Sequence, residues 1–194
     1  MLNSVIATVQ PYLKHQMNYA RQFILSPRTF GSVTPSSPWL CNRMTSLARW
    51  ETATAVAELG AGDGVLTRRL LNRLSLSAQL DAWEIQPGLA RQLQTLADQD
   101  CRLRVITRSA EQLDRKYDLV FSCLPLLSIP LATRLRILKQ IRKQLNPGGM
   151  LIQFQYSPLS EKLLSRYFEW RRIYEIRNFP PAWIYVCTPR PMPI

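Results

Sequence analysis

The sequence lacks acidic residues before Glu51, although five basic residues fall in the same stretch: Lys14, Arg21, Arg28, Arg43 and Arg49. The whole chain has 25 Lys and Arg against 13 Asp and Glu, a formal net charge of +12. This excess is high for an ordinary metabolic enzyme and favours a polyanionic partner, either nucleic acid or an anionic membrane surface. Charge does not choose between the two, but it predicts a positive face in the N-terminal quarter.

Paired cysteines and long apolar runs are also missing. The four cysteines are far apart in the sequence: Cys41, Cys101, Cys123 and Cys187. They include no C-x-x-C pair, which excludes a zinc site of usual spacing and a disulfide framework and fits a reducing cytosol. The most apolar run, residues 119–131, contains two prolines and is shorter than the ~20 residues of a bilayer span. The N-terminus does not resemble a cleaved signal. We therefore expect a cytoplasmic protein, soluble or peripheral at the inner membrane, without a metal.

Hydrophobic periodicity predicts an N-terminal helical extension, residues 1–37, and one α/β domain, residues 38–194. Apolar residues at three- and four-residue steps between positions 2 and 24 indicate an amphipathic helix, which Pro11 splits. A Ser, Thr and Pro loop follows, and Ser37 with Pro38 predicts a helix that reaches about Arg49.

The rest of the chain alternates short strands with helices. Strands are expected at 54–59, 79–84, 103–106, 117–122 and 150–156, and helices at 65–74, 87–97 and 130–145. After Tyr156 we expect a helix to about Tyr167, then a closing antiparallel pair at 173–177 and 182–187. This order predicts a mostly parallel, seven-stranded, Rossmann-like sheet flanked by helices, with ligands beyond the carboxyl ends of its strands.

A glycine-rich loop follows the first strand. Glu58 ends the strand, and Gly60, Gly62 and Gly64 make a sharp turn into a helix whose free amides suit an anion. A dinucleotide fingerprint requires G-x-G-x-x-G, but the third glycine here comes one residue early. The G-x-G-x-G spacing resembles motif I of class I methyltransferases. That resemblance implies S-adenosylmethionine as cofactor, with Glu58 near its polar end.

The next two strand ends carry further candidates for the cofactor. Glu84 lies twenty residues beyond Gly64, where a carboxylate accepts two hydrogen bonds from a ribose diol. After the third strand, Ser109 stands where many methyltransferases carry an Asp for the adenine amino group. Ser109 and Glu111 are equally suited to contact adenine and to cap a helix.

The fourth strand runs into residues 122–127, SCLPLL. Adenine N6-methyltransferases usually place a D/N/S-P-P-Y or N-L-P-Y/F segment here, with an aromatic ring that stacks on the flipped base. Ser122 and Pro125 fit that frame, but Leu126 replaces the aromatic residue. The sequence therefore predicts no base-stacking platform at this position.

From about Phe30 onward the chain resembles the bacterial phospholipid N-methyltransferases that act on phosphatidylethanolamine. The likeness lies in GSVTPSS (31–37), ELGAGDG (58–64), SCLPLL (122–127), NPGG (146–149), QFQYSP (153–158) and NFPPA (178–182). It implies N-methylation of phosphatidylethanolamine or a related aminophospholipid. The alternatives are adenine N6-methylation of rRNA, by relation to the rRNA adenine dimethyltransferases, and methylation of a small-molecule amine.

The resemblance also assigns roles to particular residues. The N-terminal helix docks on an anionic membrane through its apolar stripe and Lys14, Arg21 and Arg28, or it packs on the domain as a lid. The catalytic candidates are Tyr156, Ser122 and Tyr19; His15, the sole histidine, is a weaker one. The cofactor-binding candidates are Gly31, Val33, Thr34, Glu58, Gly60, Gly62, Gly64, Glu84, Ile85, Ser109, Ala110, Ser122 and Leu124.

Overall fold

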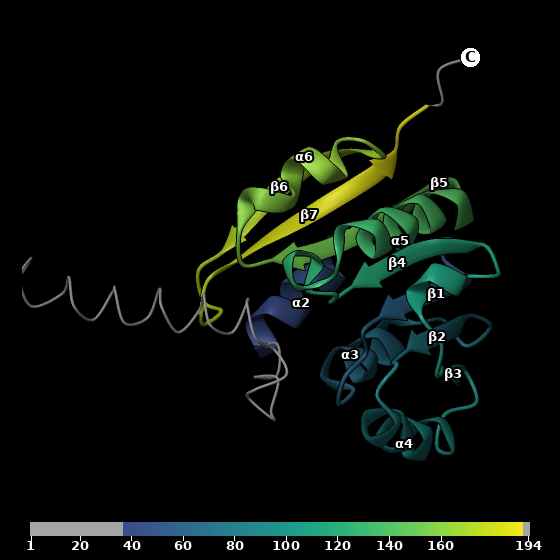
Figure 1. The fold of residues 1–194 in the computed structure, drawn as a ribbon. Coiled ribbons are helices and arrows are strands. Elements are labelled where there is room, and N and C mark those ends of the chain that lie inside the picture. The colour runs from purple at the N-terminus through teal and green to yellow at the C-terminus, as the bar shows by residue number, and fades with distance from the viewer. Residues whose placement is uncertain (1–36, 192–194) are drawn as a thin grey trace, which may run out of the picture.

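In residues 37–191, which a computed structural model describes, seven strands form one sheet in the order β3-β2-β1-β4-β5-β7-β6 (Figure 1). The strands are β1 Ala55–Leu59, β2 Gln79–Trp83, β3 Leu103–Ile106, β4 Tyr117–Ser122, β5 Leu145–Gln155, β6 Phe168–Glu175 and β7 Ala182–Pro189. β1 to β5 are parallel, and β7 lies antiparallel between β5 and β6. The predicted mostly parallel, seven-stranded Rossmann-like sheet is confirmed.

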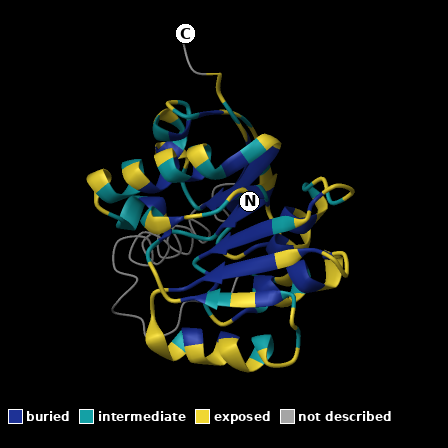
Figure 2. Ribbon diagram, turned by 90° about the vertical axis from the view of Figure 1, so that its right-hand side faces the viewer, coloured by how far each residue is buried: buried dark blue, intermediate teal, exposed yellow. Residues whose placement is uncertain are grey.

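Helices cover both faces of the sheet and bury its central strands on both sides (Figure 2). Along β1, Val56 packs in one apolar cluster and Ala57 and Leu59 in another, as alternation across a strand requires. The first cluster includes residues of α2 (Pro38–Ser46), α3 (Val65–Arg73) and α4 (Pro87–Ala97), and the second includes residues of α5 (Leu131–Gln144) and α6 (Glu161–Leu164). No helix within residues 37–191 has the length and apolar character to cross a bilayer.

Three boundary predictions were wrong. The strand expected at 150–156 begins five residues earlier, at Leu145, and ends at Gln155. The helix expected to reach Arg49 ends at Ser46, where Ser46 Oγ donates to the carbonyl of Arg43. The helix expected to reach Tyr167 ends at Leu164, so that β6 occupies residues 168–175 rather than 173–177. Charged residues interrupt the apolar alternation of β6, which an edge strand tolerates because one side of it faces water.

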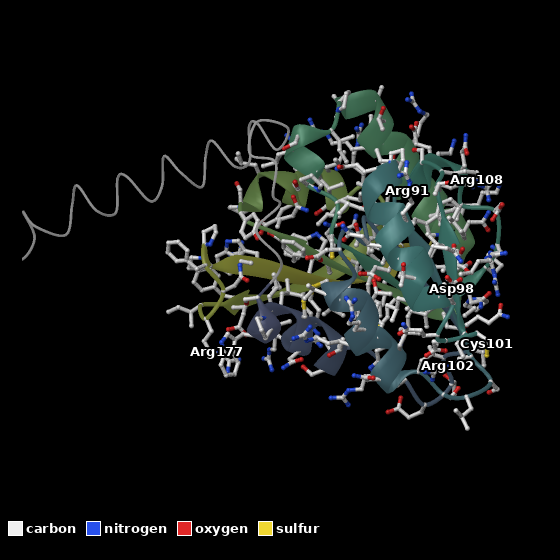
Figure 3. All side chains as sticks on the ribbon, turned by 90° about the horizontal axis from the view of Figure 1, so that it is seen from below. Arg91, Asp98, Cys101, Arg102, Arg108 and Arg177 are labelled. Atoms are coloured by element: carbon white, nitrogen blue, oxygen red, sulfur yellow. The ribbon has the colours of Figure 1, made fainter. Side chains whose placement is uncertain are left out.

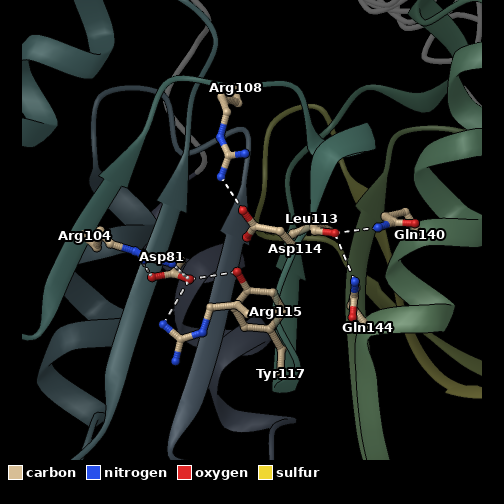
Figure 4. A network of polar contacts seen from close by, with 9 residues as sticks. All are labelled: Asp81, Arg104, Arg108, Leu113, Asp114, Arg115, Tyr117, Gln140 and Gln144. Carbon is tan, nitrogen blue, oxygen red and sulfur yellow. Dashed lines mark hydrogen bonds and ion pairs between the residues drawn. The ribbon is translucent and has the colours of Figure 1, made fainter.

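A buried carboxylate ties the β3 half of the sheet together (Figure 4). Asp81 of β2 accepts hydrogen bonds from Arg104 of β3 at 3.0 and 2.8 Å and from the Tyr117 hydroxyl of β4 at 2.7 Å. β1 lies between β2 and β4, and the residue paired with Asp81 in β1 is the small Ala57. Tyr117, the first residue of β4, therefore reaches across β1, which fixes three strands relative to one another away from the edge formed by their carboxyl ends.

Candidate active site

The strand order reverses between β1 and β4, and the loops that follow these two strands meet there. The amide of Cys123 donates to the carbonyl of Leu59 at 2.9 Å. Gly60 has φ +74°, and a Cβ on it would lie 3.0 Å from Cδ2 of Leu124. Only glycine accepts this conformation and this approach without strain. The reversal point of a doubly wound sheet is where ligands bind, so these loops outline the candidate site.

The glycine loop is fastened to the end of β2. The amides of Gly60 and Ala61 donate to the carbonyl of Trp83 at 2.8 and 3.1 Å, and the amide of Gly62 donates to Glu84 Oε2 at 2.9 Å. The other oxygen of Glu84 accepts from the amide of Gln86 at 2.8 Å. A Cβ built on Gly62 would meet no atom within 4 Å, which leaves this side of the loop open to a ligand. The glycine loop and the end of β2, which were both predicted to bind the cofactor, are therefore joined by hydrogen bonds.

Glu58 is fully buried on the face of β1 that carries α3. Its Oε2 accepts from the Thr67 hydroxyl at 2.6 Å, whereas Oε1 has no hydrogen-bond partner among the described residues. Burial raises the pKa of Glu58 to about 8, against the opposing hydrogen bond from Thr67 and with help from the carboxylates of Glu84 and Asp63. A buried oxygen without a partner, in a negative surrounding, fits a cationic donor such as an ammonium group.

Ser122 and Leu124 organise the loop after β4. Ser122 is buried, and its hydroxyl accepts from the amide of Leu124 at 3.4 Å. The side-chain amides of Gln153 and Gln155 both donate to the Leu124 carbonyl, at 3.1 and 2.9 Å. Both lone pairs of this carbonyl are therefore engaged by β5, and these hydrogen bonds attach the loop to β5.

Tyr156 and Asn178 form a wall at the end of β5. Burial raises the pKa of Tyr156, although a hydrogen bond with the Asn178 side chain opposes the shift. Asn178 Oδ1 also accepts from the amide of Ser37 at 3.2 Å, and its Nδ2 donates to the carbonyl of Pro180 at 2.6 Å. Asn178 thus links the end of β5, the β6–β7 connection and the start of α2. Sequence reasoning singled out the segment 178–182 but assigned Asn178 no role.

Two thiols lie close to Glu58 and Tyr156. Burial raises the pKa of Cys41, on α2, to about 12, and it raises the pKa of Cys123 well above its ordinary value. The carboxylate of Glu58 adds to the rise in both thiol pKa values. Burial between the glycine loop and Tyr156 therefore disfavours the anionic forms of these side chains.

The remaining predicted cofactor residues follow β2 and β3. Ser109 caps a 3-10 helix, Ala110–Gln112, with its hydroxyl accepting from the amide of Glu111 at 3.2 Å. Glu111 also forms an ion pair with Arg136. Ile85 is exposed next to Glu84, and Ala110 is buried. Ser109 therefore has the capping role, and an adenine contact by Ser109 or Glu111 stays a prediction.

Comparison with known proteins decides the chemistry. A family model described as "Methyltransferase domain" matches residues 56–149, the segment from β1 into β5 that contains the glycine loop. The chain is 28% identical over 176 residues to an ornithine lipid N-methyltransferase of Singulisphaera acidiphila, with 86% of this chain and 92% of the relative covered. This chain is an S-adenosylmethionine-dependent methyltransferase.

Solved structures agree with this methyltransferase in fold. The N-methyltransferase NodS of Bradyrhizobium japonicum WM9, in complex with S-adenosyl-L-homocysteine, superposes with a TM-score of 0.67 at 12% identity, covering 91% of this chain and 99% of NodS. The StiE O-MT structure, residues 942–1257, has a TM-score of 0.59 at 17% identity; it covers 70% of this chain, which spans 52% of StiE. An N- and an O-methyltransferase share the fold, so the fold leaves the acceptor atom open.

S-adenosylmethionine is the methyl donor of this methyltransferase. The observations that fit it are the oxygen of Glu58 that has no partner within residues 37–191, the open side of Gly62 and the buried carboxylate of Glu84. The expectations for Tyr19, Gly31, Val33 and Thr34, for His15 and for the amphipathic extension 1–37 concern residues outside the described part of the chain, save Ser37.

Proposed function

We propose that this methyltransferase methylates the amine nitrogen of an aminolipid, phosphatidylethanolamine or an ornithine lipid, at a membrane surface. The observation that carries the proposal is the similarity to the ornithine lipid N-methyltransferase over 86% of this chain. That similarity extends beyond the cofactor segment 56–149, because 86% of the chain is more than residues 1–149 alone and must include residues after 149.

The electrostatics of the site suit an amine acceptor. An amine reaches the site protonated near neutral pH and must lose its proton before its lone pair is available. The surroundings that raise the pKa values of Cys41, Cys123 and Tyr156 by burial lower the pKa of an ammonium group for the same reason. Desolvation beside these residues therefore favours the neutral amine without a dedicated base.

Tyr156 and Asn178 position the acceptor in this proposal. The raised pKa of Tyr156 keeps its hydroxyl protonated at neutral pH, so its oxygen accepts a hydrogen bond from an amine rather than a proton. Asn178 fixes that hydroxyl and is itself fixed by Ser37 and Pro180. Bound S-adenosylmethionine supplies a methyl group on a sulfonium, which is already activated. The protein residues mainly align the acceptor and exclude water.

Two features of the loop after β4 weigh against adenine as the acceptor. Leu126, at the position of the stacking aromatic residue, is fully buried in the core and offers no face to a base. The Leu124 carbonyl already accepts two side-chain amides and has no lone pair left for a base amino group.

The test offers four acceptors side by side to the full chain with methyl-labelled S-adenosylmethionine: phosphatidylethanolamine vesicles, ornithine lipid vesicles, an rRNA transcript and free ethanolamine. Label in either lipid supports the proposal, and the preferred lipid names the headgroup. Label in RNA or ethanolamine with none in lipid contradicts it.

A pair of variants tests whether Tyr156 positions the acceptor. Tyr156→Phe removes the hydroxyl and is expected to lower kcat/KM for lipid about tenfold or more, because one positioning hydrogen bond is lost. Its affinity for S-adenosylhomocysteine should stay at the wild-type value. Tyr167→Phe, just before β6 at the end of that strand away from Asn178, is the matched control and should leave both quantities unchanged.

A further inference from the structure

Large apolar side chains are exposed almost only along the sheet edge that carries the site. Among residues 37–191, seven of the eight exposed large apolar or aromatic side chains lie there. Ile85 adjoins the glycine loop. The other six, which we call the apolar rim, are Trp39, Leu131, Leu159, Tyr174, Ile176 and Phe179. The eighth, Leu76, precedes β2 at the opposite edge. Such clustering of exposed apolar surface marks an interaction site.

Three segments that carry rim residues lie next to Asn178 and Tyr156. Ser37, next to the first turn of α2 that carries Trp39, bonds Asn178, and Ile176 and Phe179 flank Asn178 in the β6–β7 connection. Figure 1 shows this connection beside α2. Leu159 follows Tyr156 by three residues, in the 3-10 helix Pro158–Ser160. Four rim residues, Trp39, Leu159, Ile176 and Phe179, therefore lie on segments adjoining Asn178 or Tyr156.

Two arginines lie over indole rings in the same region. The Arg177 guanidinium lies 5.0 Å from the ring centre of Trp39 and is held there by Glu175 at 2.9 and 3.0 Å. Arg172 lies 4.4 Å from the ring centre of Trp183, which packs on Tyr174. Figure 3 shows Arg177 at the opposite end of the molecule from Cys101 and Arg102. Trp, Tyr and Arg are the residues that settle between lipid headgroups and hydrocarbon.

We propose that the apolar rim is a membrane-docking surface, whose apolar side chains enter the bilayer interface while Arg172 and Arg177 face anionic headgroups. The proposal rests on the proposed function, since an aminolipid acceptor resides in that bilayer. A second copy of the chain or a protein partner would also cover the rim, but it would block the edge beside Tyr156. A bilayer both covers the rim and supplies the acceptor. The net charge of +12 is complementary to anionic lipid.

The test uses the full chain and measures flotation with vesicles of phosphatidylcholine and phosphatidylglycerol. Ile176→Asp and Leu159→Asp, whose side chains are 72% and 76% exposed, should each weaken binding about tenfold or more, the effect of withdrawing one large apolar side chain from an apolar phase. Leu76→Asp, at a position that is 92% exposed, is the matched control and should bind as wild type. Ile176→Ser should lose binding in the same direction without an added charge.

A second readout separates this proposal from the proposed function. On a short-chain aminolipid kept below its micelle concentration, Ile176→Asp should methylate as fast as wild type, because no surface is needed. If wild type methylates no lipid in any form, the proposed function fails while vesicle binding still reports on docking. Unchanged vesicle binding of both rim variants, or an equal loss in Leu76→Asp, would overturn the docking proposal. Loss of self-association with unchanged vesicle binding would overturn it too and make the rim an interface between copies.

Discussion

Replacing Glu58 with Gln should remove a pH dependence from cofactor binding. Burial raises the pKa of Glu58 to about 8, so most molecules carry the protonated form at neutral pH when no ligand is present. The unpaired Oε1 fits a cationic donor only after the carboxyl has ionised. Ionisation rises from about 3% at pH 6.5 to about 24% at pH 7.5, and apparent affinity follows the fraction of the competent form.

Titration calorimetry with S-adenosylhomocysteine measures this effect. Wild type should bind about eightfold more tightly at pH 7.5 than at pH 6.5, whereas Glu58→Gln should bind weakly and equally at both. The ligand's own amine stays largely protonated over this range, since α-amino groups titrate near ~7.8. Thr67→Val removes the hydrogen bond that lowers the pKa of Glu58 and should move the rise to higher pH. Equal slopes in wild type and Glu58→Gln would refute the assignment.

The raised pKa of Glu58 also predicts how the stability of the protein changes with pH. The pKa of Glu58 is higher in the folded state than its ordinary value of 4.5, so the unfolded chain binds fewer protons between pH 4.5 and about 8. The cofactor-free protein should therefore lose stability as pH rises through this window. Glu58→Gln should flatten that part of the profile in thermal melts recorded across the window. A melt profile that keeps the wild-type slope in the variant would contradict the prediction.

Two further changes test other parts of the framework. Gly60→Ala forces an L side chain into φ +74° and should cost about 1–2 kcal/mol and abolish binding of S-adenosylhomocysteine, whereas Gly88→Ala, with open space around it in α4, should keep binding and slightly raise Tm. Asp118→Ala leaves the amides of Thr54 and Ala55 without their acceptor and should lower the free energy of unfolding in urea by about 1–3 kcal/mol. Affinity for S-adenosylhomocysteine should stay at the wild-type value, and a loss of that affinity would contradict a purely structural role for Asp118.

The cofactor half of the site was predictable because its signals are local. The strand, the glycine turn and Glu84 lie within one βαβ unit, and parallel topology places successive strand ends at one edge. The left-handed conformations of Gly60, Gly62 and Gly64 explain why glycine recurs at these positions. The partner of Glu58, Thr67, lies nine residues further along on the first turn of α3 and had no separate signal.

The acceptor half was not predictable from local pattern. Asn178 reaches Tyr156 because β7 returns antiparallel beside β5, and it reaches Ser37 because α2 begins at the same edge. These contacts join residues up to 141 positions apart. β6 was misplaced because its Arg and Glu residues obscure the two-residue period. The hydrogen bonds to the Leu124 carbonyl were not predictable for the same reason, since both donors come from β5, about 30 residues further along the chain.

The position of β7 between β5 and β6 has a consequence for how the protein is made. β6 is synthesised before β7 but has no partner in the sheet until β7 has been added, because β7 alone connects it to β5. A nascent chain that ends after β6 therefore leaves the hydrogen-bonding edge of β5 open to pairing with other chains. Gln155 and Tyr156 gain their final neighbours only when that last insertion is complete, so a growing chain acquires its donor site before its acceptor site.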